Sequence, residues 1–521
     1  MPGKRIDRDE IMNGKRCHTL QGFFCLILFS LSMTPGLFSQ KVHKIDIMNA
    51  DLTASDIRIG KDARKLLGNV SLRHEDAIMS CDSAYFYPST YTVDAFSNVR
   101  IVQGDTLTLT GDRLHYDGLT RQAEVRDNVV LINQETTLVT NYLDYNRETG
   151  IAYYLGGGKI TDRENILASE QGYFYTQIDE FIFKKNVKID HPDYNIISDT
   201  LKYNTATEVA YFYGPTEIIG ENSYIYCENG WYDTRTDKSL VTRNAYLIDN
   251  ETRLNGDSLY YEGEIGFGRA MGNVQLVDSA QNMILSGHYG IYYKENQYAM
   301  ITDSAMMIQV EDADSMFVHA DTLRSMQDQE AEGSGRLLKA YYHVKIFRSD
   351  IQGMCDSLVY READSTFHFF GSPVLWSDEN QLTAGKIELL MQNKELKEMV
   401  MRDNSFIASR EDSAKYNQIR GKMMNGYFIN NELSKVLVSG NGQTIYYGVD
   451  NEEIIGVNKT ESSDLVIYLK DNKVSRVNYI GSPKGTYYPI HLFPDEEAFL
   501  SDFSWKEEWR PLKPKDIFFW K

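Results

Sequence analysis

One acidic position recurs along this sequence, and it is the serial polar feature that could do chemistry. The acid follows a small residue and is followed by an apolar residue and, in most copies, an aromatic one. Six copies are Asp82, Asp112, Asp199, Asp257, Asp321 and Asp356. A ladder of carboxylates would suit calcium or sugar ligation, but calcium needs several oxygens around each ion. The motif offers one acid per copy, and Asn141, Glu170, Glu228 and Gly287 replace it elsewhere. We therefore expect a turn role, in which the acid accepts backbone N–H bonds.

No catalytic constellation accompanies the acids. The 10 His are scattered without metal-ligand spacing, and no zinc-protease, nucleophile-elbow or phosphate-loop motif is present. Gly156, Gly157 and Gly158 stand at a repeat junction rather than between a strand and a helix, which favours a turn over a phosphate cradle. We predict that the protein is not an enzyme and uses no metal and no cofactor.

The elements that carry the acid repeat with a fixed period. An Asn marks the same point at Asn69, Asn98, Asn128, Asn186, Asn244 and Asn273, with Gly158 and Thr216 in two further copies, so that successive copies lie 28 to 30 residues apart. Such a period indicates stacked units, each of which buries its apolar face against its neighbours. The Asn suits a tight corner, and a stacked Asn ladder is the competing interpretation.

Each copy alternates apolar and polar residues with a period of two, which is typical of β-strands. Asp112, Leu114 and Tyr116 represent a second strand of the copy, and turn pairs such as Asp117-Gly118 close the unit. We expect two or three short strands per repeat and an all-β fold.

Charge limits the partners. The net charge is −20, and a chain without a basic stripe is a poor ligand for nucleic acid, which needs clustered Lys and Arg. The net negative charge also argues against simple electrostatic attraction to an anionic membrane surface. We therefore expect no nucleic acid among the partners.

The N-terminus has the pattern of a secretory signal. Lys15 and Arg16 precede the apolar run from Leu20 to Met33, and Pro35-Gly36 follows. An uncleaved anchor is the alternative. We expect an exported, periplasmic protein, and the pattern leaves association with the outer membrane open. The predicted organisation is a signal peptide over 1–40, repeats over 41–310, an inserted strand and polar loop over 311–341, degenerate repeats over 342–482, and an aromatic C-terminal cap or tail over 483–521.

Three cysteines remain after the signal, namely Cys81, Cys227 and Cys355. Each occupies the small-residue position before the repeated acid, so a packing role explains them. Cys81 and Cys227 are separated by five repeats, which places them far beyond disulfide range in a stack. We predict three free, buried thiols.

The inward-facing apolar residues are the remaining candidates for a binding site. In a closed stack they form an ordinary core, and in a stack whose two sheets splay apart they line a continuous apolar trough. The sequence does not separate these alternatives. The residues that we predict to line such a groove are Val70, Leu72, Val99, Ile101, Val129, Leu131, Val187, Ile189, Val274 and Leu276.

The tandem units resemble the OstA-like family, relatives of the periplasmic lipopolysaccharide-transport protein LptA and of the N-terminal domain of LptD. The resemblance rests on Gly68-Asn69-Val70, on the run from Gly111 to Asp117, on Gly256 to Tyr261 and on Gly272-Asn273-Val274. It covers residues 45–310 well and 340–480 weakly. The long tandem form with an aromatic C-terminal segment is similar to the OstA-like proteins of Bacteroidetes.

The resemblance implies an elongated β-jelly roll of V-shaped section. The acyl chains of lipid A would lie between the two sheets, so that the protein carries lipopolysaccharide toward the outer membrane. Edge-to-edge β contacts would join it to other lipopolysaccharide-transport components of the inner and outer membranes. This chain departs from the family pattern in its greater length than LptA and in lacking the C-terminal barrel of LptD.

A right-handed β-helix is the alternative fold. It would make the chain a polysaccharide-binding or structural surface protein with a filled core. An exposed strip of aromatics, Tyr85, Tyr87, Tyr116 and Tyr145, would then stack on sugars.

Overall fold

The structure is a computed structural model that describes residues 44–55, 59–280, 282–311, 314–329, 335–392, 395–451, 453–470 and 473–520. The predicted signal peptide, residues 1–40, lies outside the described residues. Residues 44–520 belong to one compact unit. Within them, no helix has the length and apolar character needed to cross a membrane.

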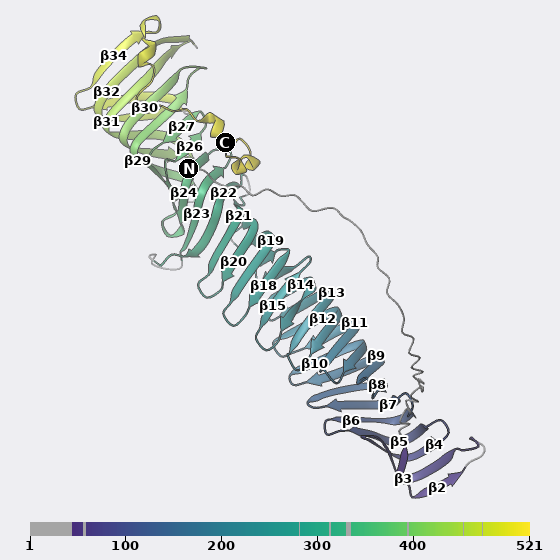
Figure 1. Ribbon diagram of the computed structural model, residues 1–521. Helices are drawn as coiled ribbons and strands as arrows, with labels where there is room; N and C mark the ends of the chain where they lie inside the picture. The colour runs from purple at the N-terminus through teal and green to yellow at the C-terminus, as the bar shows by residue number, and fades with distance from the viewer. Residues whose placement is uncertain are drawn as a thin grey trace, which may run out of the picture. The chain divides into compact units, whose positions relative to one another are not determined.

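The described chain is built almost entirely from β-strands, which follow one another in chain order (Figure 1). The first part contains β1 (Asp46–Asn49), β2 (Leu52–Ser55), β3 (Arg64–His74), β4 (Ala77–Tyr87), β5 (Thr92–Gln103), β6 (Leu107–Asp117), β7 (Gln122–Asn133), β8 (Thr136–Asn146), β9 (Ile151–Asp162), β10 (Asn165–Tyr175), β11 (Glu180–Asp190), β12 (Tyr194–Asn204), β13 (Val209–Gly220), β14 (Ser223–Asp233), β15 (Lys238–Thr242), β16 (Tyr246–Asp249), β17 (Thr252–Asn255), β18 (Ser258–Glu262) and β19 (Phe267–Asp278).

The second part continues the same pattern. It contains β20 (Met283–Tyr293), β21 (Tyr298–Gln309), β22 (Met316–Gln327), β23 (Arg336–Phe347), β24 (Gln352–Arg361), β25 (Thr366–Phe370), β26 (Val374–Ser377), β27 (Asn380–Thr383), β28 (Lys386–Gln392), β29 (Glu395–Arg410), β30 (Tyr416–Ile429), β31 (Glu432–Asp450), β32 (Glu453–Lys470), β33 (Lys473–Ile480) and β34 (Lys484–Pro489). Short 3-10 turns follow: η2 (Ile490–Leu492), η3 (Asp495–Glu497), η4 (Glu507–Trp509) and η5 (Pro514–Phe518), while η1 (Glu362–Asp364) lies between β24 and β25.

Each long strand bends in its middle and so contributes to two half-sheets. The bend in β5 lies between Phe96 and Val99, where it holds one residue more than its partner β6. We call the half-sheet that contains Thr92–Phe96 half A and the one that contains Val99–Gln103 half B. Val93 and Ala95 of half A and Val99 and Ile101 of half B all point inward and are buried. The two inner faces therefore pack against each other, and the section is V-shaped.

The repeated Asn and the repeated acid together make the corner. Ser97 and Asn98 both have positive φ, of 61° and 51°, and the Asn98 side-chain amide donates to the Asp82 carboxylate at 2.8 Å. The same bond joins Asn128 to Asp112, Asn186 to Glu170, Asn244 to Glu228 and Asn273 to Asp257. Asn adopts positive φ more readily than most residues, which explains its recurrence. The predicted corner role is confirmed, although the acid's partner is this side-chain amide rather than the backbone N–H that we expected.

All pairings between described strands are antiparallel; for example, β5 pairs with β4 and with β6. The predicted all-β, repeat-built jelly roll is therefore confirmed. The alternative right-handed β-helix is wrong, because such a helix pairs its strands in parallel. Tyr116 and Tyr145, which that alternative exposed for sugar stacking, are buried at 0% and 2% exposure.

The C-terminal segment, residues 490–520, lies on the outer face of half B, and we call it the strap. Gln418 of β30 donates to the Ala498 carbonyl and accepts from the Leu500 N–H, both at 2.8 Å. Gln381 of β27 binds the strap backbone in the same two-sided way, at Ser504 and Lys506. The strap thus runs back along the sheet from η2, which contacts β32 and β34, to η5, which contacts β22 and β23 (Figure 1).

Candidate functional site

The ten residues predicted from sequence all lie on the inner faces of half B. Val70, Leu72, Val99, Ile101, Val129, Leu131, Val187, Ile189 and Val274 are buried at 2% exposure or less, and Leu276 is half-buried. The nine buried residues belong to one hydrophobic cluster that extends from Ile45 to Val274. In this part of the chain the two half-sheets are in contact, so these side chains pack on one another.

Polar contacts join the free ends of the two half-sheets over this closed part. Glu75 and Asp76 form the turn at the end of half B, between β3 and β4. The guanidinium of Arg121, from a half A turn, lies 2.8 Å from the Glu75 carboxylate, and that of Arg147 lies 2.7 Å from Asp76. We call this set of contacts the mouth latch, because it bridges the opening of the V.

Arg147 is the central member of the mouth latch. Its side chain is only 2% exposed, and it also donates to the Tyr116 hydroxyl at 2.8 Å and to the His74 carbonyl at 3.3 Å. The Tyr116 hydroxyl lies in turn 2.6 Å from Nδ1 of His74. Burial raises the pKa of Tyr116, so its hydroxyl remains a neutral partner for the guanidinium.

A second polar bridge closes the mouth further along the chain. The Tyr203 hydroxyl of half A donates to the Asp162 carboxylate of half B at 3.3 Å, and Asn165 donates to the same hydroxyl at 3.3 Å. Burial raises the pKa of Asp162, because the interior disfavours its charged form. Together with the mouth latch, this bridge keeps the N-terminal half-sheets together.

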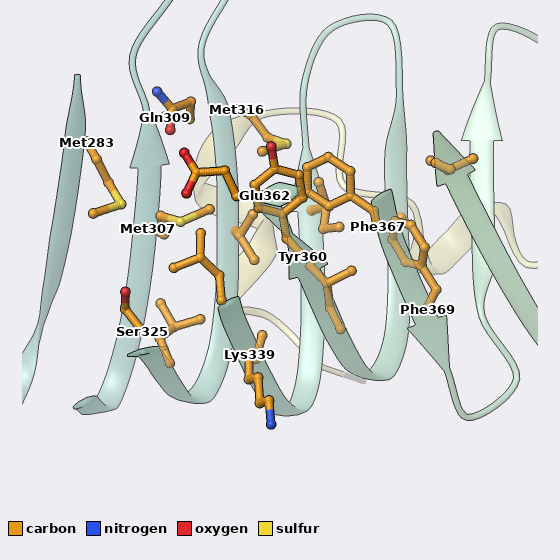
Figure 2. A pocket seen from close by; sticks show the side chains of 18 of the residues that line it. Met283, Met307, Gln309, Met316, Ser325, Lys339, Tyr360, Glu362, Phe367 and Phe369 are labelled. Atoms are coloured by element: carbon orange, nitrogen blue, oxygen red, sulfur yellow. The ribbon is translucent and has the colours of Figure 1, made fainter. Parts of the chain in front are cut away.

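The half-sheets part in the second half of the chain, where they enclose a cavity of about 480 Å³. Half A lines it with Ala299, Ile301, Leu323, Ser325, Leu338, Ala340, Leu358, Tyr360 and Phe367, and half B with Met283, Leu285, Met307, Met316, Val318, Ile346, Gly353 and Leu375. In Figure 2, Met307, Met316, Tyr360 and Phe367 project into the space between the strands. A cavity of this volume and composition is of the size that binds small apolar ligands.

The loss of one aromatic in half A explains much of the cavity. Register pairing places one row along successive strands of half A, in which every second member is large: Tyr116, Tyr145, Phe174, Tyr203, Tyr232, Tyr261 and Tyr292. The rings are buried from Tyr116 to Tyr203, and exposure then rises to 37% at Tyr292. The next large position in the row is occupied by Ser325, beside the small Ala299. Two small neighbours leave space where earlier copies place a ring.

Half B contributes to the same space through Gly353. The inward row that contains Leu131, Ile189 and Leu276 carries a branched or long apolar side chain on strand after strand. Gly353 of β24 falls in this row beside Ile346 and has no side chain. The same row passes from Leu276 directly to the cavity-lining Leu285. The sequence-predicted residues therefore lie on the inner surface that continues into the cavity.

The chemistry of the cavity is apolar with a charged rim. Met283, Met307, Met316 and Met391 line it, and thioether side chains adapt their shape to a flexible ligand. Arg348 at the rim is paired with the Asp350 carboxylate at 2.6 Å, and Glu362 accepts from the Arg336 backbone N–H at 2.8 Å. Lys339 points away from the cavity in Figure 2. The arrangement suits an apolar chain inside and a polar group outside.

Metal-ligating side chains are dispersed among the residues that the structure describes. No group of His, Cys, Asp and Glu there could hold a metal ion. Cys81, Cys227 and Cys355 are free and buried, as predicted. Burial raises the pKa of Cys81 to about 11 and that of Cys227 to about 12, so neither thiol ionises near neutral pH.

Sequence reasoning missed the cavity residues, yet one signal for them was present. The repeat reads acid, any residue, apolar, any residue, aromatic, and the copy that begins at Asp321 ends in Ser325 instead of a ring. The aromatic position of the repeat fills the core, so a small residue at that position indicates a cavity. Gly353 carried no such signal, because its position in the inward row of half B follows only from the pairing register of its strand.

Comparison with known proteins gives one match. Residues 42–199 match the family described as OstA-like protein. No curated protein sequence matches this chain.

Proposed function

From the match of residues 42–199 to the OstA-like family, we propose that this chain binds lipopolysaccharide by its acyl chains and carries it toward the outer membrane. The observation that supports this most directly is the apolar cavity between the two half-sheets, lined by the methionines and by Phe367 and Tyr360. The lipid tails occupy this space, and the sugars and phosphates remain at the charged rim.

The energetics of acyl binding are adequate without any catalytic group. Each methylene that leaves water contributes about 0.8 kcal/mol, so ten buried methylenes contribute about 8 kcal/mol. That free energy corresponds to a Kd of about 1 µM, before the cost of ordering the chain is subtracted. Such an affinity permits both loading and release, as a carrier requires.

The closed N-terminal part has a role in the same proposal. Val70, Leu72, Val99, Ile101, Val129, Leu131, Val187, Ile189, Val274 and Leu276 become lipid contacts when the mouth opens, since their inner surface is continuous with the cavity. Opening requires separation of Arg147 from Asp76 and of Tyr203 from Asp162. The lipid then moves along one inner surface instead of crossing water.

The two ends of the sheet suit edge-to-edge partners. At one end, Met48 of β1 and Leu52 of β2 are exposed, and at the other Ile480 of β33 and Tyr487 of β34 are exposed. Each end strand pairs on one side only among the described residues. Unpaired strand edges recruit further strands. We propose that other lipopolysaccharide-transport components of the inner and outer membranes add to these edges in the periplasm.

Native mass spectrometry of the full chain tests lipid binding. We expect protein produced in a lipopolysaccharide-making host to carry lipid A-containing molecules, which added lipopolysaccharide replaces and phosphatidylethanolamine does not. A chain that carries no lipid and acquires none would contradict the proposal. Depletion of the protein in its own host tests the direction of transport, because newly made lipopolysaccharide should then accumulate before the outer membrane.

A further inference from the structure

The end of the strap is held rigidly from one side. Ile517 of η5 is fully buried, and Pro511 is also buried. The Lys345 ammonium of β23, itself 3% exposed, donates to the Phe519 carbonyl at 2.7 Å and to the Trp509 carbonyl at 3.2 Å. The backbone of residues 509–520 is thus fixed to the outer face of half B.

The other side of this segment presents large apolar side chains to solvent. Leu512 is 74% exposed, Phe519 67%, Phe518 39% and Trp520 36%, all within nine residues of one turn. Tyr342, at the adjoining corner of β23, is also exposed, and the neighbouring His343 ring lies 5.1 Å from that of Trp520. Scattered exposed apolar residues need no explanation, but a group of this kind marks an interaction site.

The charge of the segment differs in sign from that of the chain. Residues 512–520 contain Lys513 and Lys515 against Asp516, a net +1, whereas the whole chain carries −20. Lys513 and Lys515 are exposed on the same turn as Leu512 and Phe519. The Asp516 carboxylate accepts from the backbone N–H groups of Leu512 and Lys513, at 3.1 and 3.2 Å, and so turns back into the segment.

We propose that residues 512–520 form a docking site for the surface of an anionic lipid bilayer. Trp, Phe and Leu side chains beside Lys are the composition that inserts at the interface between headgroups and acyl chains. The two lysines pair with anionic headgroups, and each contributes about five-fold in affinity. The acidic remainder of the chain stays away from the membrane.

The position of this site has a consequence for the cavity. Lys345 and Gln352, which hold the strap end from beneath, alternate along their strands with Ile346 and Gly353, which line the cavity. The bilayer and the cavity are therefore separated by one half-sheet. The docking site stands on its own observations and does not rest on lipopolysaccharide binding, although it would place the cavity next to a membrane.

Flotation of the full chain with vesicles tests the proposal. The probes are vesicles of phosphatidylcholine alone and of phosphatidylcholine with phosphatidylglycerol. We expect flotation with the anionic vesicles that weakens as salt rises, a loss of ten-fold or more in L512S/F519S, and a loss of about 25-fold in K513Q/K515Q. The matched control is L492S, at a strap leucine that is 62% exposed but lies outside the site, and it should float as the wild type does.

Three results would overturn the proposal. The first is a wild-type chain that floats with neither vesicle, and the second is L512S/F519S floating as well as the wild type. The third is a dimer in light scattering that L512S/F519S dissociates while flotation is absent, which would identify the surface as a protein interface. A chain that floats normally but acquires no lipopolysaccharide would leave the docking site standing and refute the proposed function alone.

Discussion

Replacing Ser325 with Phe should fill part of the cavity and weaken lipid binding strongly. Ser325 stands in the row position that holds a ring in earlier copies, and its hydroxyl is buried with no hydrogen-bond partner among the described residues. A ring there occupies the space of about four methylenes, which removes about 3 kcal/mol of acyl-chain binding. This loss corresponds to about a 200-fold increase in Kd for lipopolysaccharide.

The same substitution should stabilise the fold, which separates it from a damaging one. Filling a cavity recovers packing, and S325F also removes an unpaired buried hydroxyl, so we expect an unchanged or higher Tm. The matched control is S239F, because Ser239 lies in the same row between Tyr232 and Tyr261, where the core is closed. Overpacking there should cost about 1 to 3 kcal/mol.

Two assays decide this prediction. Titration calorimetry with lipopolysaccharide measures Kd, and differential scanning calorimetry measures Tm. S325A should bind as the wild type does, since it leaves the cavity open. The reasoning is refuted if S325F is folded, at least as stable as the wild type, and binds lipopolysaccharide with unchanged affinity.

The remaining predictions concern the corner, the mouth latch and the strap. N128A should lower the free energy of unfolding by about 1 to 2 kcal/mol in urea titrations, and N128G by less, because Asn128 has a φ of 52° that glycine adopts freely and alanine does not. R147A should lower the free energy of unfolding by about 2 kcal/mol, since it removes the guanidinium that binds both Asp76 and the Tyr116 hydroxyl. It should also increase hydrogen exchange at the turn amides of β3–β4; unchanged exchange would argue against a latch. Burial lowers the pKa of His319 below its usual 6.5, so its neutral form stabilises the fold, and stability should fall as the pH drops below about 6.5. H319Q should flatten that part of the pH profile, and an equally steep profile in H319Q would assign it to other groups.

The repeat made most of the fold predictable from sequence. Period-two alternation and the recurring Asn define strands and corners locally, so Val99 and Ile101 could be assigned to an inner face without a structure. The partner of the Asn could not be derived in this way, because Asn98 and Asp82 are 16 residues apart and meet only once two strands are in register. Pairing of this kind depends on the whole hairpin.

The sequence could not predict whether the inner faces of the two half-sheets are in contact or separated. Val129 and Leu131 have the same pattern in a closed core and in an open groove, since both environments are apolar. The difference depends on side chains from the opposite half-sheet and on turns that are distant in sequence, as with Arg147 and Asp76, 71 residues apart. The strap was equally hard to place, because its contacts with Gln381 and Gln418 join segments that share no periodic pattern.

Site-specific photo-crosslinking tests most directly the claim that lipid occupies the space between the half-sheets. A photoreactive residue at Leu338, which lines the cavity, is compared with one at Leu337, the preceding residue on the same strand, whose side chain points to the other face. We predict that lipopolysaccharide crosslinks at Leu338 and little at Leu337. Equal labelling at the two positions, or none at Leu338 in a folded chain, would contradict the account.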